Sequence, residues 1–182
     1  ETEITNNEYR EFVYWVRDSI ARTLLGEIQP DVYLISENER TGEVYDPPYL
    51  NWDEKIEWNS TEQDVRDALE DMFLPEHERF FGRKEIDTRK LFYEYYWIDL
   101  QAASRKEFGS DADYQNASLA NRPQGLKDRS VYIKKEKINV YPDTLSWIHD
   151  YSYSFNDPLT ERYFWHSAYD HYPVVGVNWN QA

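Results

Sequence analysis

The clearest pattern of apolar and polar positions in this chain predicts a helix over residues 5–25. Apolar side chains recur there at helical spacing, at Tyr9, Phe12, Val13, Val16, Ile20 and Leu24. Thr5 and Glu8 have the T-x-x-E spacing of a capping box, in which side chain and backbone satisfy each other at the helix start. Gly26 is expected just after the last turn, where glycine commonly ends a helix.

A second helix is predicted after Ser60. Ser60 is the expected cap, Gln63 completes a capping box, and Pro75 lies past the end. The buried face would be formed by Val65, Ala68, Leu69 and Met72.

The stretch between these helices combines turn residues with short apolar pieces. Residues 32–35 favour a strand, residues 37–42 a turn, and Asp46-Pro47-Pro48 is expected to interrupt regular structure. Leu50, Trp52, Ile56 and Trp58 indicate extended pieces anchored by two Trp.

The pattern changes period within residues 87–108. Aromatic and apolar residues alternate through 91–98, which favours a strand covered on both faces, and a helix over the same run is the alternative. Asp99 is then the expected cap of a helix over 100–108. Residues 109–128 are rich in Ser, Asn, Asp and Gly and predict a mobile loop.

The remaining sequence predicts further short elements. Two strands are expected at 131–133 and 138–141, with Lys134–Lys137 as a charged turn between them. Residues 143–172 are aromatic-rich and are expected to form irregular packed loops. The sum of the elements is an α+β fold with much irregular loop.

The end of the sequence predicts a buried strand at 174–177, followed by a helix start. Gly176 indicates a bulge or a close backbone approach. Asn178 and Gln181 have capping-box spacing. A helix of barely one turn is unstable alone, so we expect the sequence to end inside a domain whose missing part completes the core.

Composition and charge exclude several functions. The 182 residues carry a net charge of −15, which disfavours nucleic acid and anionic membrane surfaces as partners. Aromatic residues make up 17% of the chain, too many for a disordered acidic segment, and suit cores and interfaces alike. There is no Cys, so neither a disulfide framework nor a thiolate nucleophile is present in this sequence.

Several motifs together resemble a known family. Those motifs are Thr2-Glu3-Ile4-Thr5-Asn6-x-Glu8-Tyr9-Arg10-x-Phe12, Glu85-Ile86-Asp87-x-Arg89-Lys90-Leu91, Val140-Tyr141-Pro142-Asp143-Thr144-Leu145-x-Trp147-Ile148-x-Asp150, Tyr163-Phe164-x-His166-x-Ala168 and Tyr172-Pro173-Val174-Val175-Gly176-Val177-x-Trp179-x-Gln181-Ala182. The chain resembles the formylglycine-generating-enzyme (sulfatase-modifying-factor) fold, which is related to C-type lectins. Within that fold it looks most like the gliding-motility lipoprotein K family of Bacteroidetes (GldK/PorK).

The resemblance implies a single incomplete domain over 1–182, the N-terminal half of that fold, with insertions at 27–60 and 104–128. It implies a non-catalytic structural subunit of the outer-membrane-associated periplasmic ring of the type IX secretion and gliding motility machinery. The implied partners are a PorN/GldN-type periplasmic protein, neighbouring copies in the ring, and the outer membrane, through an N-terminal lipid outside this sequence. No cofactor is implied.

Two catalytic or ligand-binding alternatives accompany this interpretation. An oxidative enzyme of the formylglycine-generating type would use cysteines and calcium sites in the C-terminal half of its fold. A sugar- or peptide-binding module is the other alternative, because the fold is distantly lectin-like.

Candidate chemistry inside the chain is limited. His166, Asp170 and His171 include standard zinc ligands, but the two histidines do not share a helical face, so we favour packing within an aromatic layer. Aromatic side chains crowd residues 151–172, where either core packing or a partner anchor accounts for them. The candidate partner-binding residues are Tyr151, Tyr153, Phe155, Tyr163, Trp165 and Tyr169.

Overall fold

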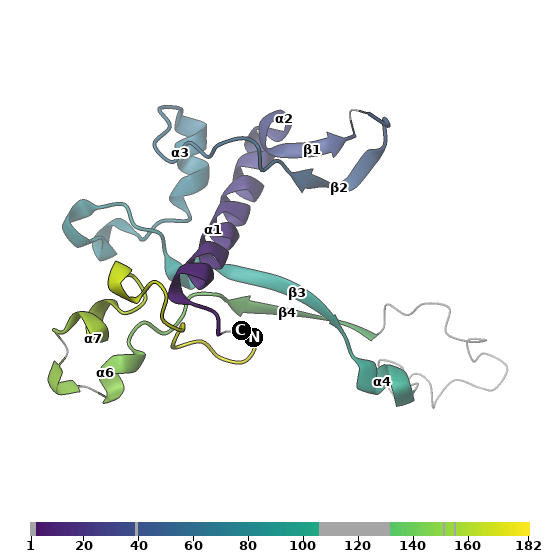
Figure 1. Cartoon of the computed structure of the whole chain (residues 1–182). Coiled ribbons are helices and arrows are strands. Elements are labelled where there is room, and N and C mark those ends of the chain that lie inside the picture. The colour runs from purple at the N-terminus through teal and green to yellow at the C-terminus, as the bar shows by residue number, and fades with distance from the viewer. Residues whose placement is uncertain (1–2, 39, 106–131, 151, 155) are drawn as a thin grey trace. The chain divides into compact units, whose positions relative to one another are not determined.

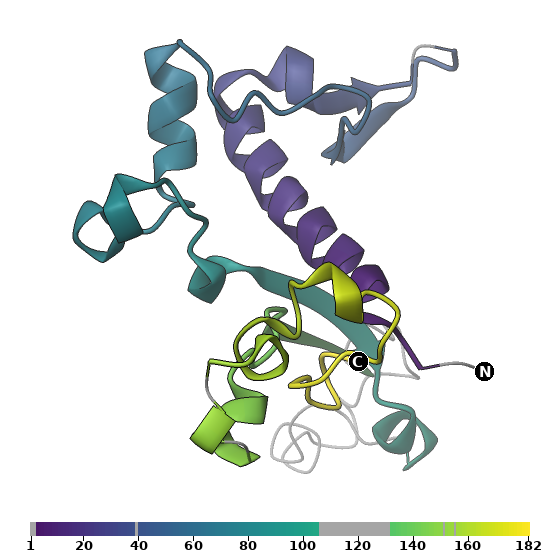
Figure 2. The same ribbon diagram turned by 60° about the vertical axis from the view of Figure 1, so that its left-hand side comes forward.

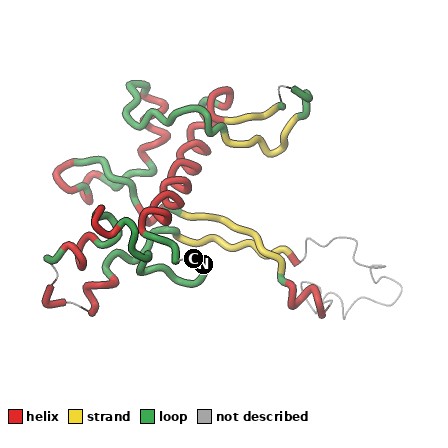
Figure 3. Tube along the Cα trace, viewed as in Figure 1, coloured by secondary structure: helices red, strands yellow, loops and turns green. Residues whose placement is uncertain are grey.

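The computed structural model describes residues 3–38, 40–105, 132–150, 152–154 and 156–182 (Figure 1). The fold is α+β, as the sequence predicted, with helices and two small antiparallel sheets. Loops and short helices make up most of the described chain (Figure 3). Two compact units are formed, Glu1–Phe92 with Asn139–Ala182, and Tyr93–Ile138. The single domain with two insertions stays a prediction.

The first unit is built on α1, Asn6–Ile28. Its predicted capping box is confirmed, because the Glu8 amide donates to Thr5 Oγ1 (3.4 Å) and the Thr5 amide donates to Glu8 Oε2 (2.9 Å). The predicted stop at Gly26 is wrong, since the helix continues through this buried residue. A Cβ at Gly26 would lie 2.8 Å from Cγ of Leu34, so glycine here lets the side chain of Leu34 pack closely against α1.

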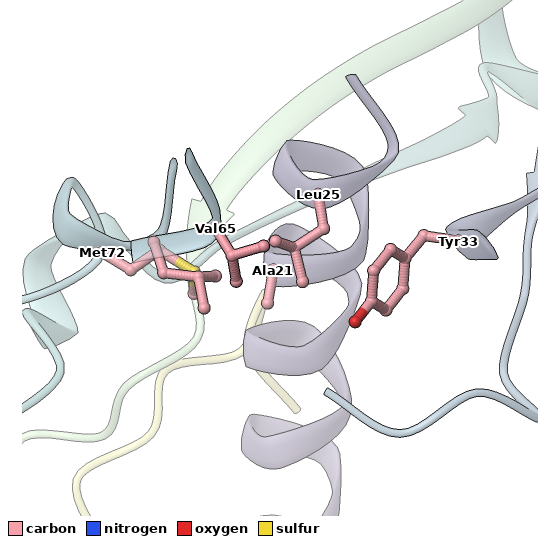
Figure 4. Close-up of a cluster of buried hydrophobic side chains, with 6 residues drawn as sticks. Ala21, Leu25, Tyr33, Val65 and Met72 are labelled. Carbon is pink, nitrogen blue, oxygen red and sulfur yellow. The ribbon is translucent and has the colours of Figure 1, made fainter. Parts of the chain in front are cut away.

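A core cluster joins α1 to two other helices, α2 (Pro30–Tyr33) and α3 (Gln63–Glu70). Its buried members are Ala21, Leu25, Tyr33, Val65, Leu69 and Met72. Figure 4 shows Tyr33 on one side of α1 and Val65 and Met72 on the other, and Figure 2 shows α3 beside α1. The predicted face of α3 is therefore confirmed.

The predicted capping box of α3 is wrong. The helix begins after Glu62, whose side chain makes no capping bond. Ser60 Oγ instead accepts a hydrogen bond from the Glu62 amide (3.2 Å), so it stabilises the turn that precedes the helix.

The first sheet pairs β1 (Leu34–Glu37) with β2 (Val44–Leu50). The strand predicted at 32–35 begins later, because Pro30 starts α2, where its fixed backbone angle suits a first helical turn. The turn after Glu37 is confirmed, with Asn38 Oδ1 accepting from the Thr41 amide (3.2 Å).

The expectation that Asp46-Pro47-Pro48 interrupts regular structure is wrong. These residues lie within β2, and the peptide bond from Asp46 to Pro47 is cis. They fall where the register between β1 and β2 is irregular. A two-stranded sheet has open edges, so the missing proline N–H groups cost no ladder bond there.

The second unit contains most of a two-stranded ribbon, β3 (Phe92–Ile98) and β4 (Ile133–Asn139). The strand is confirmed over the helical alternative. Its covering on both faces is wrong, since Tyr96, Trp97 and Ile98 are exposed.

The charged turn predicted at Lys134–Lys137 is also wrong, because these residues continue β4. Their charges pair across the ribbon: Lys135 Nζ lies 2.7 Å from Glu94 Oε1, and Tyr95 donates to Glu136 Oε2 (2.8 Å).

Beyond β3, Asp99 caps α4 (Leu100–Arg105) as predicted, its Oδ1 accepting from the Ala102 amide (2.9 Å). The predicted end of that helix at 108 and the loop at 109–128 lie outside the described residues.

The C-terminal part of the first unit is less irregular than predicted, with α6 (Ser146–Asp150) and α7 (Pro158–Arg162). The strand at 174–177 is wrong: an isolated bridge joins Pro173 to Thr5, and the valines lie half-buried in a loop. The close approach at Gly176 is confirmed by its φ of +80° and by an ideal Cβ only 2.2 Å from the Asp143 oxygen.

The capping pair at the end of the sequence is confirmed, but the helix start is wrong, because residues 179–181 form a turn. The Asn178 amide donates to Gln181 Oε1 (2.8 Å), and the Gln181 amide donates to Asn178 Oδ1 (3.0 Å).

Candidate functional site

The first turn of α1 is held by a segment from the other end of the chain, residues 163–173. The amide groups at a helix start have no partner within the helix. Here the Asn6 amide donates to the Tyr172 oxygen (2.9 Å) and the Asn7 amide to the Asp170 oxygen (3.1 Å). Backbone hydrogen bonds therefore hold residues 163–173 against the first turn of α1.

Buried side chains reinforce this attachment. Asn6 is fully buried, and its Nδ2 donates to the Tyr169 oxygen at 2.9 Å and to the Tyr163 oxygen at 3.4 Å. Arg10, also buried, donates to the Trp165 oxygen (3.3 Å) and forms an ion pair with Asp170. These contacts hold the backbone of the segment at Trp165.

Tyr9, one turn further along α1 than Asn6, also contacts residues 163–173 and the segment at Val140. Its hydroxyl donates to the Val140 oxygen (2.9 Å), and its ring packs on Phe164. Burial raises the pKa of Tyr9 to about 12, so the hydroxyl stays a donor throughout the physiological range.

Four partly exposed rings lie over the outer side of α1. We call them the aromatic face, and they are Tyr14, Trp15, Trp52 and Trp165, exposed by 42%, 44%, 42% and 41%. Trp15 stacks on Trp52 with centroids 5.8 Å apart and planes 6° from parallel. Tyr14 packs on Trp165 at 6.1 Å. Each ring of the helix thus meets one ring from a distant segment.

Two arginines of α1 stiffen the aromatic face. The Arg22 guanidinium lies 4.5 Å from the Trp52 centroid, and its nitrogens donate to the oxygens of Asn51 (2.8 Å) and Glu54 (2.9 Å). The Arg17 guanidinium lies 4.8 Å from the Tyr14 centroid. Cation–π contacts with backbone bonds of this kind hold the rings in place while leaving part of each exposed.

The candidate residues from the sequence fall in different places. Trp165 lies on the aromatic face, where its Nε1 also donates to the Tyr141 hydroxyl (2.8 Å). Tyr163 is only 7% exposed and donates to the Pro173 oxygen (2.7 Å), and Tyr169 is half-buried against it at 5.2 Å. Tyr153 is 81% exposed. Tyr151 and Phe155 lie outside the described residues.

Sequence reasoning missed three members of the aromatic face as candidate binding residues. Tyr14 and Trp15 lie off the apolar stripe of α1, on its polar side. Aromatic residues on the polar side of an amphipathic helix are a detectable signal of a binding surface. The position of Trp52 against Trp15 follows from the path of the loop, which the sequence pattern does not encode.

His166, one of the two histidines considered as metal ligands, has other contacts. His166 Nδ1 accepts from the Ala168 amide (3.1 Å), and its ring packs on Tyr169 at 5.8 Å. Across the described ranges, no group of three or more His, Asp or Glu side chains is arranged to hold a metal ion. In the same part of the chain, none of the helices combines the length and apolarity needed to cross a membrane.

Comparison with known proteins gives no match to any protein-family model, curated protein or solved structure.

Proposed function

We propose that this chain is a non-catalytic structural subunit of the periplasmic ring of the type IX secretion and gliding motility machinery. In this proposal it is a member of the GldK/PorK family with a formylglycine-generating-enzyme-like fold. It lies at the inner face of the outer membrane, carries an N-terminal lipid, and assembles with a PorN/GldN-type periplasmic protein. The resemblance of its motifs supports the family, and the aromatic face supports the binding role.

The observation that carries the proposal is the partial exposure of the four rings of the aromatic face, two from α1 and two from distant segments packed on them. Tyr, Trp and Arg are the residues most enriched at binding hot spots, and Tyr and Trp bury much area with little loss of conformational freedom. Each ring of the aromatic face is more than half covered inside the unit and so is pre-positioned. A partner that covers the remaining area gains contact without paying to order these side chains.

Charge adds a second argument. The chain has a net charge of −15, and Glu11 is exposed on α1 close in sequence to Tyr14 and Trp15. An acidic binding protein pairs best with a basic face, which accelerates association at low salt. High salt is expected to slow association with the partner, and a rate indifferent to salt would count against this part of the proposal.

The proposed mechanism is assembly. Head-to-tail contacts between identical subunits form a closed ring when the rotations from each subunit to the next add up to a full turn. One lipid chain anchors a protein weakly, so many subunits in one ring would hold the assembly to the membrane by avidity.

The test is whether the purified full-length protein captures its partner from an extract of Bacteroidetes envelopes. We compare the parent with the double variant Trp15→Ala, Trp165→Ala, and use Trp179→Ala as the matched control because that ring is 92% exposed and outside the aromatic face. The proposal predicts a PorN/GldN-type protein with the parent and the control, and at least tenfold less with the double variant. Equal capture by all three would remove the aromatic face from the interface.

A sugar-binding role is the second candidate, favoured by the same exposed indole rings, which can stack on a sugar ring. Screening of sugars by thermal stabilisation separates the two functions, since a ligand that binds only the folded state raises Tm. A Tm rise that Trp15→Ala abolishes, without capture of any protein, would favour the sugar-binding role.

A further inference from the structure

A carboxylate beside the aromatic face is left unpaired by the fold. Glu11 is exposed on α1, and its carboxylate makes no hydrogen bond or ion pair within the described residues. The carboxylate of Asp18, two turns further along the same side of α1, is paired. Arg17 Nε donates to its Oδ1 (2.7 Å), and Arg22 Nη1 lies 3.9 Å from its Oδ2. Glu11 is therefore available to a cation from outside the chain.

Helix geometry places Glu11 beside two rings of the aromatic face. At 3.6 residues per turn, Tyr14 lies about 60° to one side of Glu11 around the helix axis, and Trp15 lies about 40° to the other side. Helical side chains lean towards the N-terminus, so both rings lean towards the turn that carries Glu11. We call the surface of α1 formed by Glu11, Tyr14 and Trp15 the acidic strip.

The rings of the acidic strip are held in place by rings from distant segments. Tyr14 packs on Trp165 at 6.1 Å, and Trp15 stacks on Trp52 at 5.8 Å. Tyr14 and Trp15 nevertheless remain 42% and 44% exposed. An aromatic ring beside a carboxylate attracts a cation twice, through the quadrupole of the ring and through the negative charge. The acidic strip therefore favours a cationic group.

Arginine is the cation that the neighbouring contacts of the chain already use. The Arg17 guanidinium lies 4.8 Å from the Tyr14 centroid. The Arg22 guanidinium lies 4.5 Å from the Trp52 centroid. Both arginines also form ion pairs with Asp18, so each combines a ring and a carboxylate. Arginine suits this combination better than lysine, because its planar guanidinium stacks on rings and pairs with a carboxylate through two N–H groups.

We propose that the acidic strip binds an arginine side chain of a basic partner protein. The guanidinium packs on the exposed parts of Tyr14 and Trp15 and forms an ion pair with Glu11. This arginine contact rests on the proposed function and deepens it, because it names the chemistry that the partner brings to the aromatic face. Glu11 selects the cation, and the two rings supply the contact area.

Charge separates this occupant from a sugar and from an anionic partner. A neutral sugar gains from the rings but not from the carboxylate, so loss of the charge at Glu11 would leave its binding unchanged. An anionic partner is opposed by Glu11 and by the net charge of −15. Dependence of binding on the charge at Glu11 is therefore the signature of the arginine contact.

The experiment is a titration of the purified full chain with the capped tripeptide acetyl-Gly-Arg-Gly-amide and with its Lys and Ala counterparts. Shifts of the indole N–H signals in NMR spectra report binding, and the variants Trp15→Ala and Trp165→Ala assign those signals. The arginine peptide is expected to shift the Trp15 signal and to bind at least twofold more tightly than the lysine peptide. The alanine peptide is expected to leave the signal unchanged.

Two variants of α1 separate the acidic strip from the general charge of the chain. Glu11→Gln keeps the shape of the side chain and is expected to weaken binding of the arginine peptide at least threefold. Glu27→Gln is the matched control, because Glu27 is exposed on α1, about 160° around the helix from Glu11, and its loss changes the net charge equally. This control is expected to bind the arginine peptide as the parent does.

Four outcomes would overturn the arginine contact. Equal weakening in Glu11→Gln and Glu27→Gln would reduce binding to general attraction by an acidic chain. An alanine peptide that binds like the arginine peptide would remove the role of charge, and a lysine peptide that binds as tightly would remove the preference for arginine. Self-association of the parent in sedimentation velocity, abolished by Glu11→Gln, would assign the cation to a second copy of the chain.

Failure here is distinguishable from failure of the proposed function. Peptide binding is measured without a partner protein, and Glu11→Lys and Glu27→Lys form a matched pair for the capture experiment. Capture that survives in Glu11→Lys but is lost in the double variant Trp15→Ala, Trp165→Ala would keep the ring subunit and overturn the arginine contact. Charge-dependent binding of the arginine peptide without capture of a PorN/GldN-type protein would support the contact and remove the named partner.

Discussion

The indole rings of Trp15 and Trp52 lie parallel, with centroids 5.8 Å apart, and join α1 to a loop that follows β2. The stack gives Trp15 two roles, since it holds the loop and also offers an exposed edge. Trp15→Ala is expected to lower the free energy of unfolding by about 1–2 kcal/mol, because roughly half of a large ring is buried. Urea denaturation measures this loss, and Trp179→Ala is the control, expected within about 0.5 kcal/mol of the parent. Equal losses in both variants would contradict the stack as a structural contact.

Asn6 supplies a prediction about the attachment of the C-terminal segment. Asn6→Ala removes the bonds to the Tyr163 and Tyr169 oxygens and leaves both buried acceptors short of a donor. The free energy of unfolding is expected to fall by about 1–3 kcal/mol. Asn7→Ala is the matched control, because Asn7 is exposed and its bond to Asp170 uses the backbone amide. An unchanged stability for Asn6→Ala would contradict this role.

Substitution of Phe81 by Asn is expected to raise the stability of the fold, whereas most substitutions lower it. Phe81→Asn places a residue that tolerates left-handed backbone at φ 49°, so stability is expected to rise by about 0.5–1 kcal/mol. Phe80→Asn is the control, since Phe81 is the non-glycine residue with positive φ among those described, and it is expected to give no gain. Thermal unfolding measures both. A stability of Phe81→Asn no higher than the parent's would contradict backbone strain at Phe81.

Two glycines with positive φ separate backbone strain from steric clash. Gly82→Ala meets open space and is expected to cost about 1 kcal/mol through its backbone conformation alone. Gly176→Ala has a similar backbone cost, and its Cβ would also meet the Asp143 oxygen at 2.2 Å, so its cost is expected to exceed that of Gly82→Ala. Equal costs would contradict the close approach of these two backbone segments.

Stability is expected to decline at both ends of the pH scale. Hydrogen bonds from Arg89 lower the pKa of the buried Asp87, and those from Lys84 and Arg79 lower the pKa of Glu70. Unfolding therefore takes up protons as pH falls, so the stability present above the ordinary values of 3.8 and 4.5 is lost as pH falls through the lowered folded values.

Ionisation of Tyr9 is expected to lower the stability of the fold at alkaline pH. Its pKa rises from 10.0 to about 12 in the folded chain, so its contribution is complete below pH 10 and is lost as pH rises towards 12. Urea midpoints from pH 3 to pH 11 measure both limbs. Asp87→Asn is expected to flatten the acid limb, and an acid limb identical to the parent's would contradict the assignment.

Local features of the fold were predictable from the sequence. The capping box of Thr5 and Glu8, the face of α3 and the pair Asn178–Gln181 depend on residues near each other in the chain. The close approach at Gly176 was predictable from the glycine, but its partner, Asp143, was not. The prediction that Gly26 ends the helix was wrong, because glycine at this position allows a close contact with Leu34. The spacing of apolar and polar residues does not reveal that contact.

The site itself was largely beyond sequence reasoning. Trp165 was a candidate, but its neighbour Tyr14 comes from the opposite end of the chain and is brought there by Asn6 and Arg10. The turn predicted at Lys134–Lys137 was wrong for a related reason. Pairing with Glu94 and Tyr95 across the ribbon stabilises these residues as part of β4. Contacts distant in sequence, rather than local preference, determine both.

The most direct test of the central claim is negative-stain microscopy of the purified chain mixed with a purified PorN/GldN-type protein. Rings that contain both proteins are expected with the parent and with Trp179→Ala, and fewer rings are expected with the double variant Trp15→Ala, Trp165→Ala. Separate monomers of the two proteins under conditions in which both are folded would contradict it.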